Sequence, residues 1–188
     1  MIERPDRSLF GRWARPFAPT EFGASLRDVD LEDVVARGKR LVLLDVDNTL
    51  VPWGSEALPD WVLEWLAQGR SLGLEFCILS NTRHPARLAR LAERMGIPFL
   101  RGKFKPNPDV YRRALAQFGV EAKQAIMIGD QLFTDVLGAN RAGIESVWLV
   151  PMARKEFIGT KVSRMGERLL SRHFKKRLRR KPGGPSSQ

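Results

Sequence analysis

The sequence predicts an α/β fold in which a mostly parallel sheet carries helices on both faces. Short apolar runs typical of buried strands alternate with stretches of helical periodicity, and short links join them. The predicted strands are apolar along most of their length, as strands are when both faces of a sheet are covered. A chain of 188 residues, 43% of them apolar, suits one domain with a buried core.

The alternation begins after an N-terminal segment that shows no clear period. Residues 1–24 are rich in Pro, Arg and aromatic residues, and they predict an irregular arm. A short helix is expected over 28–38, because acidic residues open it and a glycine closes it. The run LVLLDVD at 41–47 predicts a buried strand. The stretch 58–70 has apolar residues at helical spacing and predicts a helix.

The same alternation continues to the end of the predicted domain. Gly96 and Gly119 mark the ends of two helices, and Pro108 lies in the first turn of the second. No internal repeat is visible. The expected elements are a strand at 74–81, a helix at 83–96, a short strand at 98–100, a helix at 107–119, a strand at 125–130, a helix at 134–143 and a strand at 145–150.

Charge divides the chain into three predicted parts: an N-terminal arm at 1–27, a domain at 28–160 and a basic tail at 161–188. The tail holds ten Lys or Arg and one Glu, so it carries +9 of the net charge of +11. Its apolar residues recur between the basic ones as in a basic amphipathic helix, and its end, KPGGPSSQ, predicts disorder. Such a helix can lie on an anionic membrane, pack on the protein's own core or bind RNA, and we favour the membrane.

The composition also indicates where the protein resides. No apolar run reaches the roughly 18–20 residues that a transmembrane helix needs. The first residues carry charges and prolines where a signal peptide has its apolar stretch. The single cysteine, Cys77, excludes an intramolecular disulfide, and its apolar neighbours predict a buried thiol rather than a nucleophile. We expect a cytoplasmic protein that contacts the inner membrane face if the tail binds lipid.

Polar residues follow the predicted strands at the edge where parallel sheets bind their ligands. They are Asp45, Asp47, Ser80, Asn81 and Asp130. A further acid, Asp135, lies close behind the last of these. Neighbouring carboxylates repel one another, so they need a cation or a proton to coexist. Magnesium takes such carboxylate oxygens together with phosphate and water, so the pattern favours a Mg²⁺ site.

Each of these motifs also has a purely structural interpretation. The Asp-rich segment after the first strand could be a solvated turn. Thr134 and Asp135 could cap the N-terminus of a helix and complement its dipole. Lys103 and Lys105 precede Pro106, and either lysine could neutralise a phosphate or simply lie on the surface. The order of the motifs along the chain favours the chemical interpretation.

Taken together, the motifs resemble those of the haloacid dehalogenase (HAD) superfamily of phosphohydrolases. They are DVDNTLV at 45–51, a strand ending in Ser80, Lys105-Pro106 and GDQLFTD at 129–135. The resemblance covers roughly residues 28–150. It implies a Rossmann-like fold and a Mg²⁺-dependent phosphomonoesterase that acts through an aspartyl-phosphate.

The resemblance implies a catalytic role for three of the matched residues. Asp45 would be the nucleophile, and Asp47 would protonate the leaving oxygen and then activate water. Lys105 would neutralise the phosphoryl group, with Lys103 as the alternative; the proline that follows Lys105 favours the former.

The remaining matched residues are implied in binding. Thr49 would help to hold the first motif, Ser80 would bind the phosphoryl group, and Asn81 offers an amide donor to the phosphate. The metal would be held by Asp45, the main chain of Asp47, Asp130 and Asp135.

The spacing of the motifs bears on the substrate. The links from Asp45 to Ser80 and from Ser80 to Lys105 are too short for a cap domain, so we expect an open site. An open site favours a substrate presented by a large body, such as a protein, a nucleic acid or a lipid headgroup, unless another copy of the chain covers it.

A finer resemblance points to one branch of the superfamily. The segments VDL at 29–31, DVDNTLVPW at 45–53 and GDQLFTDVLGANRAG at 129–143 resemble subfamily IIIA and, within it, the YqeG-like phosphatases. That branch is similar to phosphatidylglycerophosphate phosphatases, which implies a lipid substrate. The alternatives are a phosphatase of nucleotides, sugar phosphates or nucleic-acid ends, or an RNA- or ribosome-associated protein on a HAD scaffold. The complete set of acids argues against an inactive scaffold.

Overall fold

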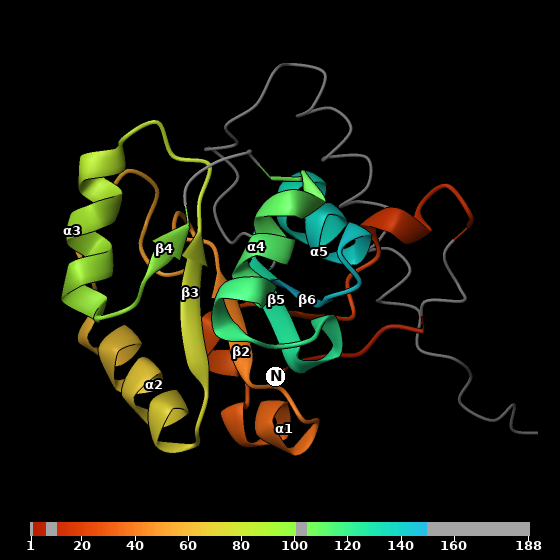
Figure 1. The fold of residues 1–188 in the computed structure, drawn as a ribbon, viewed down its shortest axis with the longest axis horizontal. Helices are drawn as coiled ribbons and strands as arrows, with labels where there is room; N and C mark the ends of the chain where they lie inside the picture. The colour runs from red at the N-terminus through yellow and green to blue at the C-terminus, as the bar shows by residue number, and fades with distance from the viewer. Residues whose placement is uncertain (1, 7–10, 101–104, 150–188) are drawn as a thin grey trace, which may run out of the picture.

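A computed structural model describes residues 2–6, 11–100 and 105–149 of the chain (Figure 1). It confirms the predicted parallel α/β architecture. One six-stranded sheet has the order β1-β6-β5-β2-β3-β4, and every neighbouring pair is parallel. The strands are β1 (Glu21–Gly23), β2 (Leu41–Leu44), β3 (Glu75–Leu79), β4 (Phe99–Leu100), β5 (Ala125–Gly129) and β6 (Glu145–Leu149).

Helices cover both faces of the sheet, as Figure 1 shows. The α-helices are α1 (Leu31–Ala36), α2 (Asp60–Ser71), α3 (Pro85–Met95), α4 (Pro108–Phe118) and α5 (Leu137–Arg141). The shorter turns are η2 (Arg15–Phe17), η3 (Leu26–Asp28), η4 (Ala122–Gln124) and η5 (Leu132–Val136). Gly96 and Gly119 end α3 and α4 in the left-handed conformation, as the sequence predicted.

The strands bury alternate side chains in two separate cores. Val42 and Leu44 of β2 pack in the core under α2 and α3. Leu41 and Leu43 pack in the core under α4. Because successive side chains of a strand point to opposite faces, four consecutive apolar residues are what a strand covered on both sides requires. Cys77 is buried in the second core, and burial raises the pKa of its thiol to about 12.

The strand order places the functional edge of the sheet. After β2 the chain adds β3 and β4 on one side, and then returns to place β5 on the other side of β2. The order therefore reverses between β2 and β5, and a crevice opens at the carboxyl ends of these two strands. Asp45 follows β2 and Asp130 follows β5.

Part of the N-terminal segment is more regular than the sequence predicted. β1 extends the sheet beyond β6, with Phe22 opposite Trp148. The buried Glu21 is paired with Arg37, whose Nη1 lies 2.7 Å from its Oε1. Further upstream, the ring of Phe17 packs 4.9 Å from that of Phe133. These residues close one end of the core, whereas Trp13 is exposed.

The helix predicted over 134–143 starts earlier and is not uniformly α-helical. Leu132–Val136 form a π-helical turn, and α5 continues from it. The hydroxyl of Tyr111 lies 3.0 Å from the carbonyl oxygen of Thr134 and 3.2 Å from that of Asp135. These contacts fix the turn that carries Asp135.

Several sequence predictions concern residues outside the described ranges. Lys103 and the basic tail at 161–188 are among them. The predicted boundaries at residues 27 and 160 also stay predictions. Within the described ranges, no helix combines the length and apolar character that crossing a bilayer demands.

We expect Leu66→Ala to lower the free energy of unfolding by about 2–5 kcal/mol, because it opens a cavity in the core. Leu66 of α2 is 0% exposed. Its matched control is Leu63→Ala on the same helix, where the side chain is 37% exposed and the expected change is within about 0.5 kcal/mol. Urea denaturation of both variants measures the difference. Equal losses would contradict the described packing of α2.

Candidate active site

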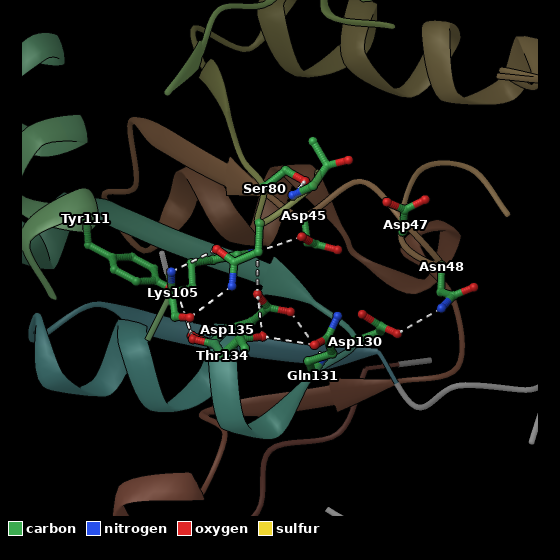
Figure 2. Close-up of polar contacts among 12 residues, drawn as sticks. Asp45, Asp47, Asn48, Ser80, Lys105, Tyr111, Asp130, Gln131, Thr134 and Asp135 are labelled. Atoms are coloured by element: carbon green, nitrogen blue, oxygen red, sulfur yellow. Dashed lines mark hydrogen bonds and ion pairs between the residues drawn. The ribbon is translucent and has the colours of Figure 1, made fainter. Parts of the chain in front are cut away.

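The centre of the site is the ammonium group of Lys105. Its Nζ lies 2.5 Å from Asp45 Oδ1 and 2.7 Å from Asp135 Oδ1 (Figure 2). All three side chains are buried. Charges are rarely buried unless they are paired, so each group depends on the others for its place. The structure thus brings Lys105 to the predicted nucleophile.

Asp130 adds a third buried carboxylate to this group. It follows β5, and Trp148 Nε1 donates to its main-chain oxygen over 2.9 Å. Asn48 Nδ2 donates to Asp130 Oδ2 over 3.3 Å, and Asn48 has a positive φ of 61°. Asp130 Oδ1 is buried and has no hydrogen-bond partner among the described residues. A proton or a cation would satisfy an orphaned carboxylate oxygen of this kind.

Asp135 reaches the group by folding back against the end of β5. A Cβ atom at Gly129 would lie 2.2 Å from Asp135 Oδ2, so no larger residue fits at position 129. Gln131 N donates to the same oxygen over 3.1 Å. Gly129 therefore leaves space for the carboxylate of Asp135, and the next residue, Asp130, adds its own carboxylate to the site.

Burial and mutual repulsion shift the protonation of these acids. Burial raises the pKa of Asp45 to about 7, with the charges of Asp135 and Asp47 adding to the rise and Lys105 opposing it. Burial also raises the pKa of Asp130 to about 8, and the charges of Asp45 and Asp135 add to that rise. For Lys105, burial lowers the pKa, but Asp135 and Asp45 outweigh burial and hold the pKa above its usual value.

The three carboxylates lie close enough together to hold a divalent cation. One oxygen from each of Asp45, Asp130 and Asp135 lies within 4.8 Å of the others. A hard cation takes oxygen ligands of this type. It would also satisfy the orphaned oxygen of Asp130 and offset the repulsion that raises these pKa values. The residues present therefore fit the metal that the motifs predicted.

Asp47 was predicted to act beside Asp45, but its side chain lies apart from the three clustered carboxylates (Figure 2). Both of its oxygens contact the guanidinium of Arg87 on α3. Sequence reasoning missed Arg87, which is one of several arginines in the helix predicted over 83–96. A signal was available: Arg87 lies four positions before the buried Leu91 and so shares its face of the helix.

The other predicted substrate-binding residues take different positions. Ser80 lines the cavity, and its Oγ accepts from Thr82 N over 3.3 Å. Asn81 holds the backbone of Lys105: its Oδ1 accepts from Lys105 N over 2.8 Å and its Nδ2 donates to Lys105 O over 2.9 Å. Thr49 is buried and is not among the residues that line the cavity.

An open cavity of about 1190 Å³ leads to these groups. Its volume far exceeds that of a phosphate group. Trp53, which is 43% exposed, lies on its wall. The lining residues include Asp45, Asp47, Trp53, Ser80, Arg87 and Lys105. The cavity thus connects the buried charged groups to solvent. It has room for a substrate that is larger than its phosphate group.

Comparisons with known proteins agree with the motifs and the fold. The profile of the HAD-hydrolase-like family matches residues 104–150. The chain is 31% identical over 161 residues to the probable phosphatase YqeG of Bacillus subtilis, and the match covers 86% of this chain and 93% of that protein. It is 29% identical over 164 residues to phosphatidylglycerophosphate phosphatase 1 of Arabidopsis thaliana, which covers 82% of this chain but only 47% of the plant protein.

Solved structures show the same fold. An uncharacterized protein of Listeria monocytogenes serotype 4b aligns with a TM-score of 0.50 at 22% identity, over 71% of this chain and 99% of that chain. The magnesium-bound HAD-hydrolase YfnB of Bacillus subtilis aligns with a TM-score of 0.51 at 13% identity, over 64% of this chain and 90% of that chain. At these identities the likeness concerns the fold alone.

The raised pKa values predict how stability depends on pH. Asp45 and Asp130 titrate near pH 4 in an unfolded chain but at about 7 and about 8 in the fold, so the metal-free fold holds extra protons between these limits. The free energy of unfolding of the metal-free protein should fall as pH rises through this window. Thermal unfolding in EDTA between about pH 5 and pH 9 measures this contribution. Asp130→Asn, which has no carboxyl to titrate at that position, should show a weaker fall.

Mg²⁺ should counter this loss, because its carboxylate ligands must be deprotonated. At a concentration 100-fold above its Kd, a bound ion adds about 2.7 kcal/mol of stability. We expect Mg²⁺ to raise the melting temperature more at about pH 8.5 than at about pH 6, where the pKa values of Asp45 and Asp130 disfavour binding. An equal rise at both pH values would contradict the raised pKa values of these two acids.

Proposed function

This chain belongs to the HAD superfamily and is a phosphoric monoester hydrolase related to YqeG, and on that premise we propose that it hydrolyses its substrate through an aspartyl-phosphate on Asp45. The observation that carries the proposal is the contact of Lys105 with Asp45 inside a cluster of three buried carboxylates. Phosphoryl transfer needs mainly positioning and neutralisation of charge. A fixed ammonium beside a buried carboxylate supplies both.

In the first step, a carboxylate oxygen of Asp45 attacks the phosphorus atom and the bond to the leaving oxygen breaks. Asp47 gives a proton to that oxygen, and the alcohol leaves. In the second step, Asp47 takes a proton from water, which attacks the phosphorus atom and releases phosphate and the free carboxylate of Asp45. A carboxylate nucleophile thus divides one difficult displacement into two easier ones.

Other residues hold the reacting groups in place. Lys105 neutralises charge on Asp45 and on the phosphoryl group, and Asn81 fixes the backbone of Lys105. Ser80, on the wall of the cavity, offers its hydroxyl to a phosphoryl oxygen. Mg²⁺ held by Asp45, Asp130 and Asp135 would supply positive charge that stabilises the transferring group.

The substrate we propose is phosphatidylglycerophosphate or a similar anionic phosphomonoester. The similarity to the Arabidopsis phosphatidylglycerophosphate phosphatase supports a lipid. The open cavity, with an exposed tryptophan on its wall, supports a phosphate presented on a larger body. The net charge of +9 on the segment 161–188 supports reaction at an anionic membrane surface.

Asp45→Asn should lower phosphate release by at least about 1000-fold, because an amide cannot form the phosphoryl ester. The variant should stay folded, since the change is isosteric and removes a carboxyl that is costly to bury. Release of phosphate from 4-nitrophenyl phosphate with Mg²⁺ measures the effect. Asp60→Asn, an exposed acid on α2, is the matched control and should leave the rate unchanged. Turnover retained by Asp45→Asn would remove Asp45 as the nucleophile.

The substrate class is tested with a panel in which Asp45→Asn serves as the blank. It contains phosphatidylglycerophosphate in mixed micelles, mononucleotides and phosphorylated oligonucleotides. We expect kcat/KM for the lipid to exceed that for the others by at least about tenfold, a difference of about 1.4 kcal/mol in transition-state binding. A preference for nucleotides or oligonucleotides would instead support the nucleic-acid alternative.

A further inference from the structure

Arg87 is buried, whereas arginine side chains usually lie exposed on the protein surface. It lies in the first turn of α3 and is only 8% exposed. Its Nη2 lies 2.8 Å from Asp47 Oδ1 and its Nη1 lies 3.2 Å from Asp47 Oδ2. Two parallel contacts between a guanidinium and a carboxylate fix the orientation of the carboxylate as well as its position.

The same guanidinium also holds the loop that follows Asp47. Its Nε and Nη2 donate to the carbonyl oxygen of Ser55, over 3.1 and 2.5 Å. From that loop, Gly54 N donates to Asp47 Oδ1 over 2.9 Å. Three N–H groups from two segments therefore converge on one carboxylate. This is more than a carboxylate in a solvated turn would need.

We propose that Arg87 is the positioning residue for the Asp47 carboxylate: it holds that side chain on the cavity wall, apart from the metal-binding acids. The inference rests on the proposed function, in which Asp47 moves the protons. Asp47 and Arg87 both line the cavity, whereas the Asp45, Asp130 and Asp135 carboxylates cluster around Lys105. Figure 2 shows Asp47 set apart from that cluster. Without Arg87, Asp47 could turn toward the same cation as the other acids.

The two chemical steps depend on Asp47 to different degrees when the leaving group is 4-nitrophenolate. This anion leaves without being protonated, so the attack by Asp45 does not need the acid. The second step still does: water attacks the phosphorus atom, its proton passes to Asp47, and the bond between phosphorus and the Asp45 oxygen breaks. A misplaced Asp47 slows this second step, and phosphorylated enzyme accumulates.

The test compares Arg87→Met and Arg87→Lys with the wild type in rapid mixing with 4-nitrophenyl phosphate and Mg²⁺. For Arg87→Met we expect kcat to fall about 100-fold while kcat/KM changes less than about threefold, because only the second step is slowed. A burst of 4-nitrophenolate close to one per enzyme molecule should precede the slow turnover. Arg87→Lys keeps the charge but not the two-point contact, so its kcat should lie between those of the wild type and Arg87→Met.

Arg94→Met is the matched control. Arg94 lies on the same helix and its Nη1 donates to the carbonyl oxygen of Glu56 over 2.6 Å, so it ties down the same loop without touching Asp47. We expect neither a fall in kcat nor a burst. A glycerol phosphate, whose alkoxide must be protonated to leave, should lose kcat/KM as well as kcat in Arg87→Met.

The outcomes separate the inference from the function on which it rests. Unchanged kinetics in Arg87→Met, or an equal loss of kcat and kcat/KM on 4-nitrophenyl phosphate without a burst, would overturn the positioning role. If Arg87→Met does not fold, the burst of Arg87→Lys decides in the same way. If the wild type releases no more 4-nitrophenolate than Asp45→Asn, the proposed function itself is wrong and the inference falls with it.

Discussion

A buried lysine between two buried carboxylates is the constraint on which the site depends. Lys105 contacts Asp45 and Asp135 at hydrogen-bond distance, and all three side chains are buried. Removing Lys105 would leave two unpaired carboxylates in a medium of low polarity, which is costly. The protein therefore has to hold all three side chains in fixed positions. Much of the surrounding structure serves this requirement.

The supports come from segments far apart in the sequence. Asn81, at the end of β3, binds both backbone groups of Lys105. Gly129 leaves the space that the carboxylate of Asp135 fills, and Tyr111 of α4 contacts the turn that bears it. Trp148 of β6 holds the main chain of Asp130. Contacts from β5, β6, α4 and the segment after β3 thus support the charged cluster, so the chemistry and the fold share the same residues.

The sequence was enough to predict those features that depend on periodic patterns or on neighbouring residues. Apolar runs predicted the inner strands, and Gly96 and Gly119 predicted two helix ends, because strand burial and left-handed caps act through neighbouring residues. The polar residues after β2 and β5 could be expected to meet, since parallel strands end at one edge. The structure places Asp45, Asp130 and Asp135 within one small group there.

What escaped prediction depends on contacts between distant segments. β1 has only three residues and exists because β6 offers it an edge. The π-helical turn is fixed by the tyrosine of another helix, and Asn81 finds its partner in the backbone of Lys105. Arg87 resembles its neighbouring arginines in sequence, but in the structure it is buried and contacts Asp47.

The place of β1 at the edge of the sheet also affects assembly. Ser146 N donates to Thr20 Oγ1 across 126 positions of sequence, so during synthesis on a ribosome β1 cannot pair until β6 has been made. Among the strand pairs of the described residues, this pair closes the longest loop and so carries the largest entropy cost of loop closure. The N-terminal segment that packs against the π-helical turn therefore reaches its final place only after β6 has been synthesised.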